Sequence, residues 1–309
     1  MIKAFFPAKT ERIFHRGKYG NVYRLDSIER VVQITNRLRF EKGYDVREVD
    51  VKDDSLLKIA HSPNLINSYL TGKPIKLAQG SGILWQDDFY PWLVNKSWSS
   101  VLATKEALES GRSIAIQDGG HHAEYASGHG FGPINNMVIA AKYLLENKVA
   151  KKICILDLDV HYANGTHSLV ENNDRILSLD LWKYKLDKWK FTRNSKNILG
   201  SKVNKVAEYF TNLKILLHEA ERFNPDIVLY YLGLDVLNSD RIGGISGFNS
   251  NILLKREQMV AKFVEDTKLP ICIYIGGGYI DHSEPEAEVR KKFKHLIDLY
   301  LRSIKILTS

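Results

Sequence analysis

Short apolar runs alternate with longer amphipathic stretches along this chain. The runs are mostly rich in β-branched residues, as expected of strands buried on both faces of a sheet, and they cover 113–117, 152–157, 176–179, 227–232 and 271–275. Between them, apolar residues repeat with the 3.6-residue period of a helix over 134–145 and 203–220. Further helices are expected over about 255–267 and 285–306, the last opening after Ser283-Glu-Pro-Glu.

This alternation predicts an α/β fold. Consecutive strand–helix–strand units build an open, mostly parallel sheet with helices on both faces. At 309 residues the chain is long enough for two average domains. It contains no stretch typical of a linker and no internal repeat, however, and α/β folds often exceed about 200 residues as one unit. We therefore expect residues 1–309 to form a single domain.

Composition places the protein among ordinary globular chains. Hydrophobic residues make up 44% and charged residues 26%, which excludes a disordered chain. The sequence has no run of about 18 apolar residues that could span a membrane, and its first residues lack the apolar core of a secretory signal. Cys154 and Cys272 lie inside apolar runs and are interpreted as buried thiols. These features predict a cytoplasmic protein without a membrane partner.

The charge balance is basic, with 44 Lys and Arg against 36 Asp and Glu and a formal net charge of +8. Nucleic-acid binding needs clustered basic residues, whereas the lysines here are scattered. The densest basic run, 290–295, falls in a predicted helix and is typical of a solvated face. Nucleic acid is therefore not an expected partner.

Chemically reactive side chains follow four of the predicted strands. In open α/β sheets ligands bind at the carboxyl ends of the strands, so residues that come directly after a strand are the candidates for a site. In chain order these side chains are His121, His122, Asp157, Asp159, His161, Asp235 and Tyr279. We expect all of them to converge on one edge of the sheet.

Asp159 and His161 are two residues apart at a strand end, so their side chains can point the same way. With Asp235 they offer two carboxylates and one imidazole. Three protein ligands with an open position are typical of a catalytic metal site, whose bound water is made acidic beside a substrate carbonyl. The alternative is that the aspartates cap helices and the histidine is packed. That alternative is favoured for any one residue by itself, but the convergence of all three favours the metal.

The remaining groups are suited to proton transfer. One histidine of the pair His121-His122 can take a proton from water and return it to a leaving amine, while the other supplies charge or a hydrogen bond. Tyr279 follows three glycines, and its hydroxyl could donate to an oxygen that becomes negative in the transition state. A half-buried tyrosine bonded to the backbone is the structural alternative, and for this motif in isolation it is the better interpretation.

Five motifs together resemble the zinc-dependent histone deacetylase family, in its order and spacing. They are Gly119-Gly-His-His-Ala123, Gly128-His-Gly-Phe-Gly-Pro-Ile-Asn-Asn136, Asp157-Leu-Asp-Val-His-Tyr-Ala-Asn-Gly-Thr166, Gly233-Leu-Asp-Val-Leu-Asn-Ser-Asp240 and Gly276-Gly-Gly-Tyr279. The stretch from Tyr90 to Gly111 resembles the bacterial branch near the class IV deacetylases, and His61-Ser-Pro through Gly72 also fits the family. The resemblance implies a fold of the arginase–deacetylase type.

The resemblance implies two metal sites. The Zn²⁺ ligands would be Asp159, His161 and Asp235. A structural K⁺ would be bound by the side chains of Asp157 and Ser178 and by the backbone of Asp159, His161 and Leu179. Oxygen and nitrogen ligands suit several divalent ions, so Fe²⁺ is the alternative to Zn²⁺ at the first site.

It also implies the catalytic groups of a hydrolase acting on a linear amide. His122 would be the general base and acid, with Asn164 supporting it. His121, oriented by Asp157, would be a second, electrostatic histidine. Tyr279 would polarise the amide carbonyl of an acylated lysine or a related acylated amine.

The substrate side is implied by three further positions. Gly130 and Phe131 would line the tunnel, where an apolar wall suits the methylenes of an acylated lysine. Relatives that act on polyamines carry a glutamate seven residues beyond the last metal-ligand aspartate, and that position is Ile242 here, beside Arg241. Isoleucine offers no carboxylate to an ammonium group. We therefore expect an acyl-lysine peptide or protein to be preferred over an acylated small amine.

Three departures from the family pattern bear on substrate choice. Gly132 replaces a usual cysteine, and Tyr162 replaces a histidine or glutamine. The segment 180–184 lacks the proline–glycine loop that often supplies a second tunnel aromatic, which predicts a wider pocket and room for an acyl chain longer than acetyl. None of the three removes a predicted ligand or proton carrier.

Two other functions are compatible with parts of the pattern. An arginase-like ureohydrolase with two metals would need further carboxylates beside Asp157 and Asp235, and the segment 233–237 offers only one. A non-catalytic acyl-lysine binder would bind without turnover, and the complete proton-transfer set argues against it. If the protein is a deacetylase, an acetylpolyamine deacetylase is the remaining alternative.

Overall fold

The computed structural model describes residues 1–13, 15–16, 22–23, 26–185 and 196–309. Within them, one eight-stranded sheet has the order β4-β1-β5-β10-β9-β6-β7-β8, and every neighbouring pair is parallel. Its strands are β1 (Ile2–Pro7), β4 (Tyr44–Val49), β5 (Arg112–Ala115), β6 (Ile153–Asp157), β7 (Ile176–Trp182), β8 (Ile198–Lys202), β9 (Ile227–Leu232) and β10 (Ile271–Ile275). The predicted open parallel sheet is confirmed.

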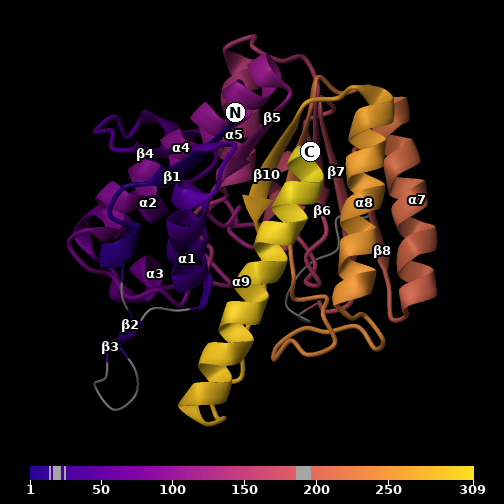
Figure 1. Ribbon diagram of the computed structural model, residues 1–309. Helices are drawn as coiled ribbons and strands as arrows, with labels where there is room; N and C mark the ends of the chain where they lie inside the picture. Colours follow the sequence, from indigo (N-terminus) through magenta and orange to yellow (C-terminus); the bar gives the residue numbers. More distant parts are fainter. Residues whose placement is uncertain (14, 17–21, 24–25, 186–195) are drawn as a thin grey trace.

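Helices cover both faces of this sheet (Figure 1). One apolar core lies between the sheet and the inward faces of α1 (Asp26–Phe40), α7 (Val206–Phe223), α8 (Ser250–Thr267) and α9 (Glu286–Thr308). A second core on the opposite face includes α2 (Pro63–Thr71), α4 (Phe89–Ser110) and α5 (Asn136–Glu146). Alternate side chains of one strand enter different cores, as the pleat requires; Cys154 and Leu156 face the first, and Ile153 and Ile155 the second.

The smaller elements complete the chain. They are the short strands β2 (His15–Arg16) and β3 (Val22–Tyr23), which pair antiparallel away from the main sheet, the 3₁₀ turns η1 (Thr10–Arg12) and η2 (Ser55–Ile59), and the helices α3 (Ile75–Ala78) and α6 (Asn164–Val170). The helix α5 begins where Asn135 caps it, because the Asn135 side chain accepts the amide of Val138 at 3.1 Å. This cap sits beside the loop that carries the histidine pair.

All five predicted strands and all four predicted helices are present, and the structure adds elements that the pattern does not show. The outer strands β4 and β8 carry polar and half-exposed side chains because each lies at an edge of the sheet. The helix α4 packs against several neighbours at once and buries Ser97, Ser99, Ser100 and Thr104. Its apolar positions therefore do not form the narrow stripe by which a surface helix is recognised.

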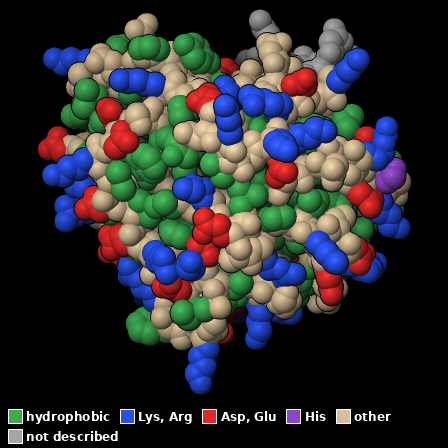
Figure 2. Space-filling view, turned by 90° about the horizontal axis from the view of Figure 1, so that it is seen from above, with side chains coloured by type: hydrophobic (Ala, Val, Ile, Leu, Met, Phe, Trp, Pro, Cys, Tyr) green, Lys and Arg blue, Asp and Glu red, His purple; other side chains and the backbone are tan. Residues whose placement is uncertain are grey.

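The basic run at the start of α9 is a solvated face, as predicted. Arg290 pairs with Glu286, Lys291 with Glu288, and Lys292 with Glu284. The face of the molecule in Figure 2 likewise shows acidic and basic side chains interspersed. Among the described helices, none combines the length and apolar character that crossing a bilayer requires.

A buried ion pair in α8 ties this helix to the ends of two central strands. Arg256 is fully buried, and its guanidinium donates to the carbonyls of Leu158 at 3.0 Å and Gly233 at 2.9 Å. It also pairs with Glu257 at 2.5 Å, and Glu257 accepts the hydroxyl of Tyr230 at 2.6 Å. Because these carbonyls lie just past β6 and β9, Arg256 fixes the course of the chain where both strands end.

We expect Arg256→Met to lower the free energy of unfolding by about 3–5 kcal/mol, because it leaves the Glu257 carboxylate buried without its cation. Urea denaturation followed by circular dichroism measures this. The matched control is Lys262→Met on the same helix, where the exposed pair with Asp266 contributes little. Equal losses for the two variants would show that the buried pair has no special role.

Candidate functional site

The side chains predicted to converge come from adjacent strands of the sheet. The strands β5, β10, β9 and β6 are neighbours in that order, and all run in parallel. The histidine pair follows β5, Tyr279 follows β10, Asp235 follows β9, and the segment with Asp159 follows β6. Their carboxyl ends lie at the same edge (Figure 1), so the predicted convergence on one edge is confirmed.

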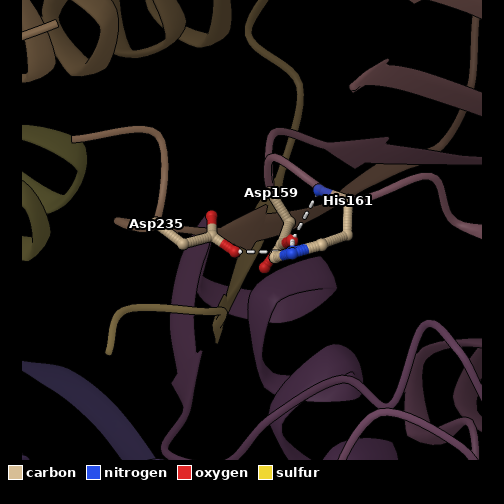
Figure 3. Close-up of side chains that lie close together, drawn as sticks. All are labelled: Asp159, His161 and Asp235. Carbon is tan, nitrogen blue, oxygen red and sulfur yellow. Dashed lines mark hydrogen bonds and ion pairs between the residues drawn. The ribbon is translucent and has the colours of Figure 1, made fainter. Parts of the chain in front are cut away.

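Asp159, His161 and Asp235 form a compact cluster at this edge (Figure 3). His161 Nδ1 lies 3.0 Å from Asp159 Oδ1 and 3.0 Å from Asp235 Oδ2. One ligand atom from each of the three residues lies within 4.8 Å of the other two. Two carboxylates and one imidazole at this separation can hold a divalent ion, with a coordination position left for water or substrate.

The backbone around the cluster holds the carboxylates in place. Asp235 Oδ1 accepts the amide of Val160 at 3.0 Å, and Asp159 Oδ2 accepts the amide of Gly277 at 2.9 Å. A Cβ atom at Gly277 would overlap both Asp235 Oδ2 and Asp159 Oδ2, so the two carboxylates occupy the space that a side chain there would fill. His161 Nε2 donates to the carbonyl of Ile242 at 3.3 Å, which turns Nδ1 toward the carboxylates.

The negative charge of the two buried carboxylates favours a positive charge at the cluster. Burial and then the Asp159 charge raise the pKa of Asp235 to about 8. Burial disfavours a charged His161, but its hydrogen bonds with both carboxylates outweigh this and raise the pKa of His161 well above its usual value. A bound divalent ion supplies the same positive charge and requires a neutral imidazole, so metal and proton compete for His161. The donor set therefore fits a metal ion.

The two adjacent histidines have opposite electrostatic character. His121 Nδ1 lies 2.9 Å from Asp157 Oδ2; although burial opposes the charge, this carboxylate raises the pKa of His121 to about 9. His122 Nδ1 instead meets the neutral Asn164 Oδ1 at 2.8 Å. Burial, together with the charge on His121 3.9 Å away between ring centroids, lowers the pKa of His122 well below its usual value. These opposite pKa shifts favour a charged His121 and a neutral His122.

Tyr279 stands at the same edge with its hydroxyl protonated. Burial raises the pKa of Tyr279 well above its usual value, against the opposing effect of the nearby Arg30 guanidinium, which lies 5.5 Å from the ring centroid. Asp240 accepts the Tyr279 amide at 2.6 Å and so fixes the loop. The Phe131 ring lies 5.8 Å from that of Tyr279. A protonated phenol beside an apolar wall can donate to a bound carbonyl oxygen.

Of the residues predicted to bind K⁺, Asp157, Ser178 and Leu179 lie on β6 and β7, and Asp159 and His161 follow the end of β6. Asp157 and Asp180 are register partners, and Ser178 is two residues before Asp180, so all three side chains share one face of the sheet. The Ser178 hydroxyl is buried and has no hydrogen-bond partner among the described residues, and the same holds for Asp180 Oδ1. Buried oxygens that lack a hydrogen-bond donor are suitable ligands for a hard cation such as K⁺. Leu179, on the opposite face, can offer only its carbonyl.

The predicted substrate-side residues lie close to the cluster. Gly130 packs so tightly against His122 that a Cβ atom there would overlap the imidazole ring. Ile242 has an exposed side chain, while its carbonyl contacts His161. Both positions are compatible with the mouth of a pocket, and their contact with substrate stays a prediction.

One aromatic residue at the site was missed by the sequence reasoning. The Tyr184 ring lies 5.9 Å from that of His161, and its hydroxyl donates to the carbonyl of Gly243 at 3.3 Å. The segment 180–184 lacks the expected proline–glycine loop, yet its last residue still places an aromatic ring beside the cluster. Two backbone hydrogen bonds bring the ring there: the Tyr162 amide donates to the Tyr184 carbonyl at 2.8 Å, and the Tyr184 amide donates to the Val160 carbonyl at 3.1 Å. This pairing joins separate segments, so the local sequence does not reveal it.

Comparison with known proteins finds related sequences. A sequence model of the histone deacetylase domain matches residues 21–291. Histone deacetylase 2 of Arabidopsis thaliana is 25% identical over 241 residues, 74% of this chain and 61% of that protein. Histone deacetylase clr6 of Schizosaccharomyces pombe is 25% identical over 62% of this chain and 49% of that protein. The chain thus spans 49% to 61% of the length of these two named relatives.

Two solved structures share the fold. Acetylpolyamine aminohydrolase from Burkholderia pseudomallei superposes with a TM-score of 0.74 at 15% identity, covering 98% of both chains. The HDA15 HD domain gives a TM-score of 0.78 at 15% identity, covering 99% of this chain and 90% of that one. At this level of identity the likeness establishes the architecture, and the predicted arginase–deacetylase type of fold is confirmed.

We expect Asp235→Ala to lose bound metal together with activity, because two remaining protein ligands hold a divalent ion poorly. Elemental analysis of the purified protein measures the metal content per chain. Asp266→Ala, which removes an exposed carboxylate from α8, is the control and should keep its metal. A full complement of metal in the Asp235 variant would remove this residue from the ligand set.

Proposed function

Because the chain belongs to the histone deacetylase family, we propose that it is a metal-dependent hydrolase that removes the acyl group, in the first instance acetyl, from an acylated lysine side chain. The observation that carries this proposal is the cluster of Asp159, His161 and Asp235 beside one charged and one neutral histidine. A ligand set and a separate proton carrier in one buried place are what amide hydrolysis needs.

Asp159, His161 and Asp235 would hold the divalent ion, with Zn²⁺ as the proposed metal and Fe²⁺ as the alternative. When bound, such an ion lowers the pKa of a water molecule and polarises a carbonyl oxygen. We also propose a structural K⁺ at Asp157 and Ser178 and the neighbouring carbonyls. Its support is the unpartnered Ser178 hydroxyl, and its role would be to offset the buried charge of Asp157.

The protein's own groups divide the proton chemistry. His122 is neutral, so it can accept a proton at Nε2 and later return it to the nitrogen of the departing lysine amine. His121 keeps its positive charge close to the reacting atoms, where it favours the negative charge that develops on the substrate. Tyr279 holds its hydroxyl proton and can donate it in a hydrogen bond to the acyl oxygen.

The rim of the site favours a lysine over a polyamine. Phe131 and Tyr184 offer aromatic surface for the lysine methylenes, and Ile242 exposes 42% of its surface at the mouth. A polyamine carries a second ammonium group, which an isoleucine at this position cannot pair. The acetylpolyamine aminohydrolase shares the fold of this chain at 15% identity, and a likeness at that level concerns the fold alone.

We expect His122→Ala to retain its metal and to lose at least about 100-fold in kcat, because water then has no positioned base. Steady-state kinetics with an acetyl-lysine peptide, alongside metal analysis of the same preparation, measure both properties. Near-normal turnover in this variant would reassign the base to His121.

We expect acyl-lysine peptides to exceed N-acetylputrescine and N-acetylspermidine in kcat/KM by at least about tenfold, or about 1.4 kcal/mol. A panel of acetyl- and longer acyl-lysine peptides, assayed with and without a chelator, tests the proposed function itself. Turnover that survives complete metal removal would refute the metal-dependent reaction. A better rate with the acetylpolyamines would refute the argument from Ile242.

A further inference from the structure

The neutral partner of His122 has a charged partner of its own. Asn164 Oδ1 meets His122 Nδ1 at 2.8 Å, and Asn164 Nδ2 donates to Glu124 Oε1 at 2.8 Å. We propose that Glu124 is a positioning residue: it fixes the orientation of the Asn164 amide and thereby the ring nitrogen of His122 that carries the proton. This inference rests on the proposed role of His122 as the base.

The chemistry of the amide makes the orientation consequential. An asparagine side chain offers an acceptor oxygen and a donor nitrogen of nearly equal size, so it fits one space in two ways. An ionised carboxylate can only accept, and therefore Glu124 selects the orientation in which the Asn164 nitrogen faces it. The weaker contact of Asn164 Nδ2 with the His122 carbonyl, at 3.5 Å, favours the same orientation.

The orientation of Asn164 decides the tautomer of His122. With its oxygen facing His122 Nδ1, Asn164 requires a proton on Nδ1, and Nε2 is left with the lone pair that accepts a proton during the reaction. In the opposite orientation Asn164 Nδ2 would donate to Nδ1, and the ring would carry its proton on Nε2. With the proton already on Nε2, the ring has no lone pair at that nitrogen and cannot take up a proton there.

The backbone of Glu124 is itself held by a buried histidine. Burial lowers the pKa of His61 to about 4, so the ring is neutral at physiological pH. Its Nε2 accepts the amide of Asn135 at 2.9 Å, and its Nδ1 donates to the Glu124 carbonyl at 2.9 Å. The Glu124 amide donates to the carbonyl of Ser127 at 2.9 Å. Both backbone groups of Glu124 are thus bonded, which fixes the position of its main chain beside Asn164.

Close approach of two segments brings the side chains within reach. A Cβ atom at Gly165 would overlap the carbonyl of Ala123, so the start of α6 lies directly against the chain that links His122 to Glu124. This contact places the Asn164 side chain between those of His122 and Glu124. The packing of the backbone therefore keeps the side chains of Asn164 and Glu124 within hydrogen-bonding reach of each other.

The first test compares two variants of Glu124 in the full-length, metal-loaded protein. Glu124→Met removes the acceptor, and we expect kcat on an acetyl-lysine peptide to fall about tenfold with KM unchanged. Glu124→Gln keeps an oxygen that can accept from Asn164, so it should restore a large part of that loss. Glu146→Met, an exposed position at the end of α5, is the matched control and should match the wild-type protein. Equal losses for Glu124→Met and Glu124→Gln would overturn the orientation argument.

The second test removes the need for an orienting group. Asn164→Asp presents two equivalent acceptor oxygens, so no amide orientation remains to be selected. In this background the additional change Glu124→Met should no longer lower kcat, because no amide orientation is left to select and the repulsion between the two carboxylates is removed; this is a clear departure from additivity. If Glu124→Met costs the same factor in both backgrounds, Glu124 acts in some other way and the proposal is wrong.

The third test reads the tautomer without any turnover. Long-range ¹H–¹⁵N spectra of histidine-labelled protein distinguish the two neutral forms of the ring, and His122→Ala assigns the signal. We expect the Nδ1–H form in the wild-type protein and a mixture of both forms in Glu124→Met. An unchanged tautomer in that variant refutes the role of Glu124. A wild-type protein that hydrolyses no acylated amine would instead refute the proposed function, so the two failures are distinguishable.

Discussion

The structure depends on the burial of several carboxylates at one edge of a parallel sheet. Asp157, Asp180 and Asp235 are fully buried and Asp159 is nearly so, in a region where each negative charge raises the cost of the next. A bare cluster of this kind would be unstable. Backbone amides and His121 provide part of the compensation. The cation that we propose at Asp159, His161 and Asp235 would provide the rest.

The same constraint gives two neighbouring histidines opposite pKa shifts. His121 and His122 are consecutive and equally inaccessible to water, yet one is paired with Asp157 and the other with the amide of Asn164. A charged partner stabilises the imidazolium, whereas a neutral partner cannot offset the cost of burial. The charge that settles on His121 then further disfavours a charge on His122. The difference between the two proposed roles, an electrostatic group for His121 and a base for His122, thus follows from the hydrogen-bond partner of each histidine.

The rest of the fold keeps this edge in register. Parallel strands bring residues separated by more than a hundred positions, such as His121 and Tyr279, to the same side of the sheet. Arg256 bonds the carbonyls that follow β6 and β9, directly beside the residues that carry Asp159 and Asp235. The helix α8, which carries Arg256, therefore helps to position the proposed metal ligands Asp159 and Asp235. Stability and site geometry are coupled through this one guanidinium.

By itself, the sequence determined the central strands, the amphipathic helices and the residues at the strand ends, because these depend on local periodicity and on the shared direction of parallel strands. Asp159, His161 and Asp235 could be grouped for that reason. The edge strands β4 and β8 and the helix α4 were decided by tertiary contacts, since their patterns reflect how many neighbours cover them. The contacts of Tyr184 with His161 and of Glu124 with Asn164 join separate segments. No local pattern carries that information, because it arises only when the backbone packs.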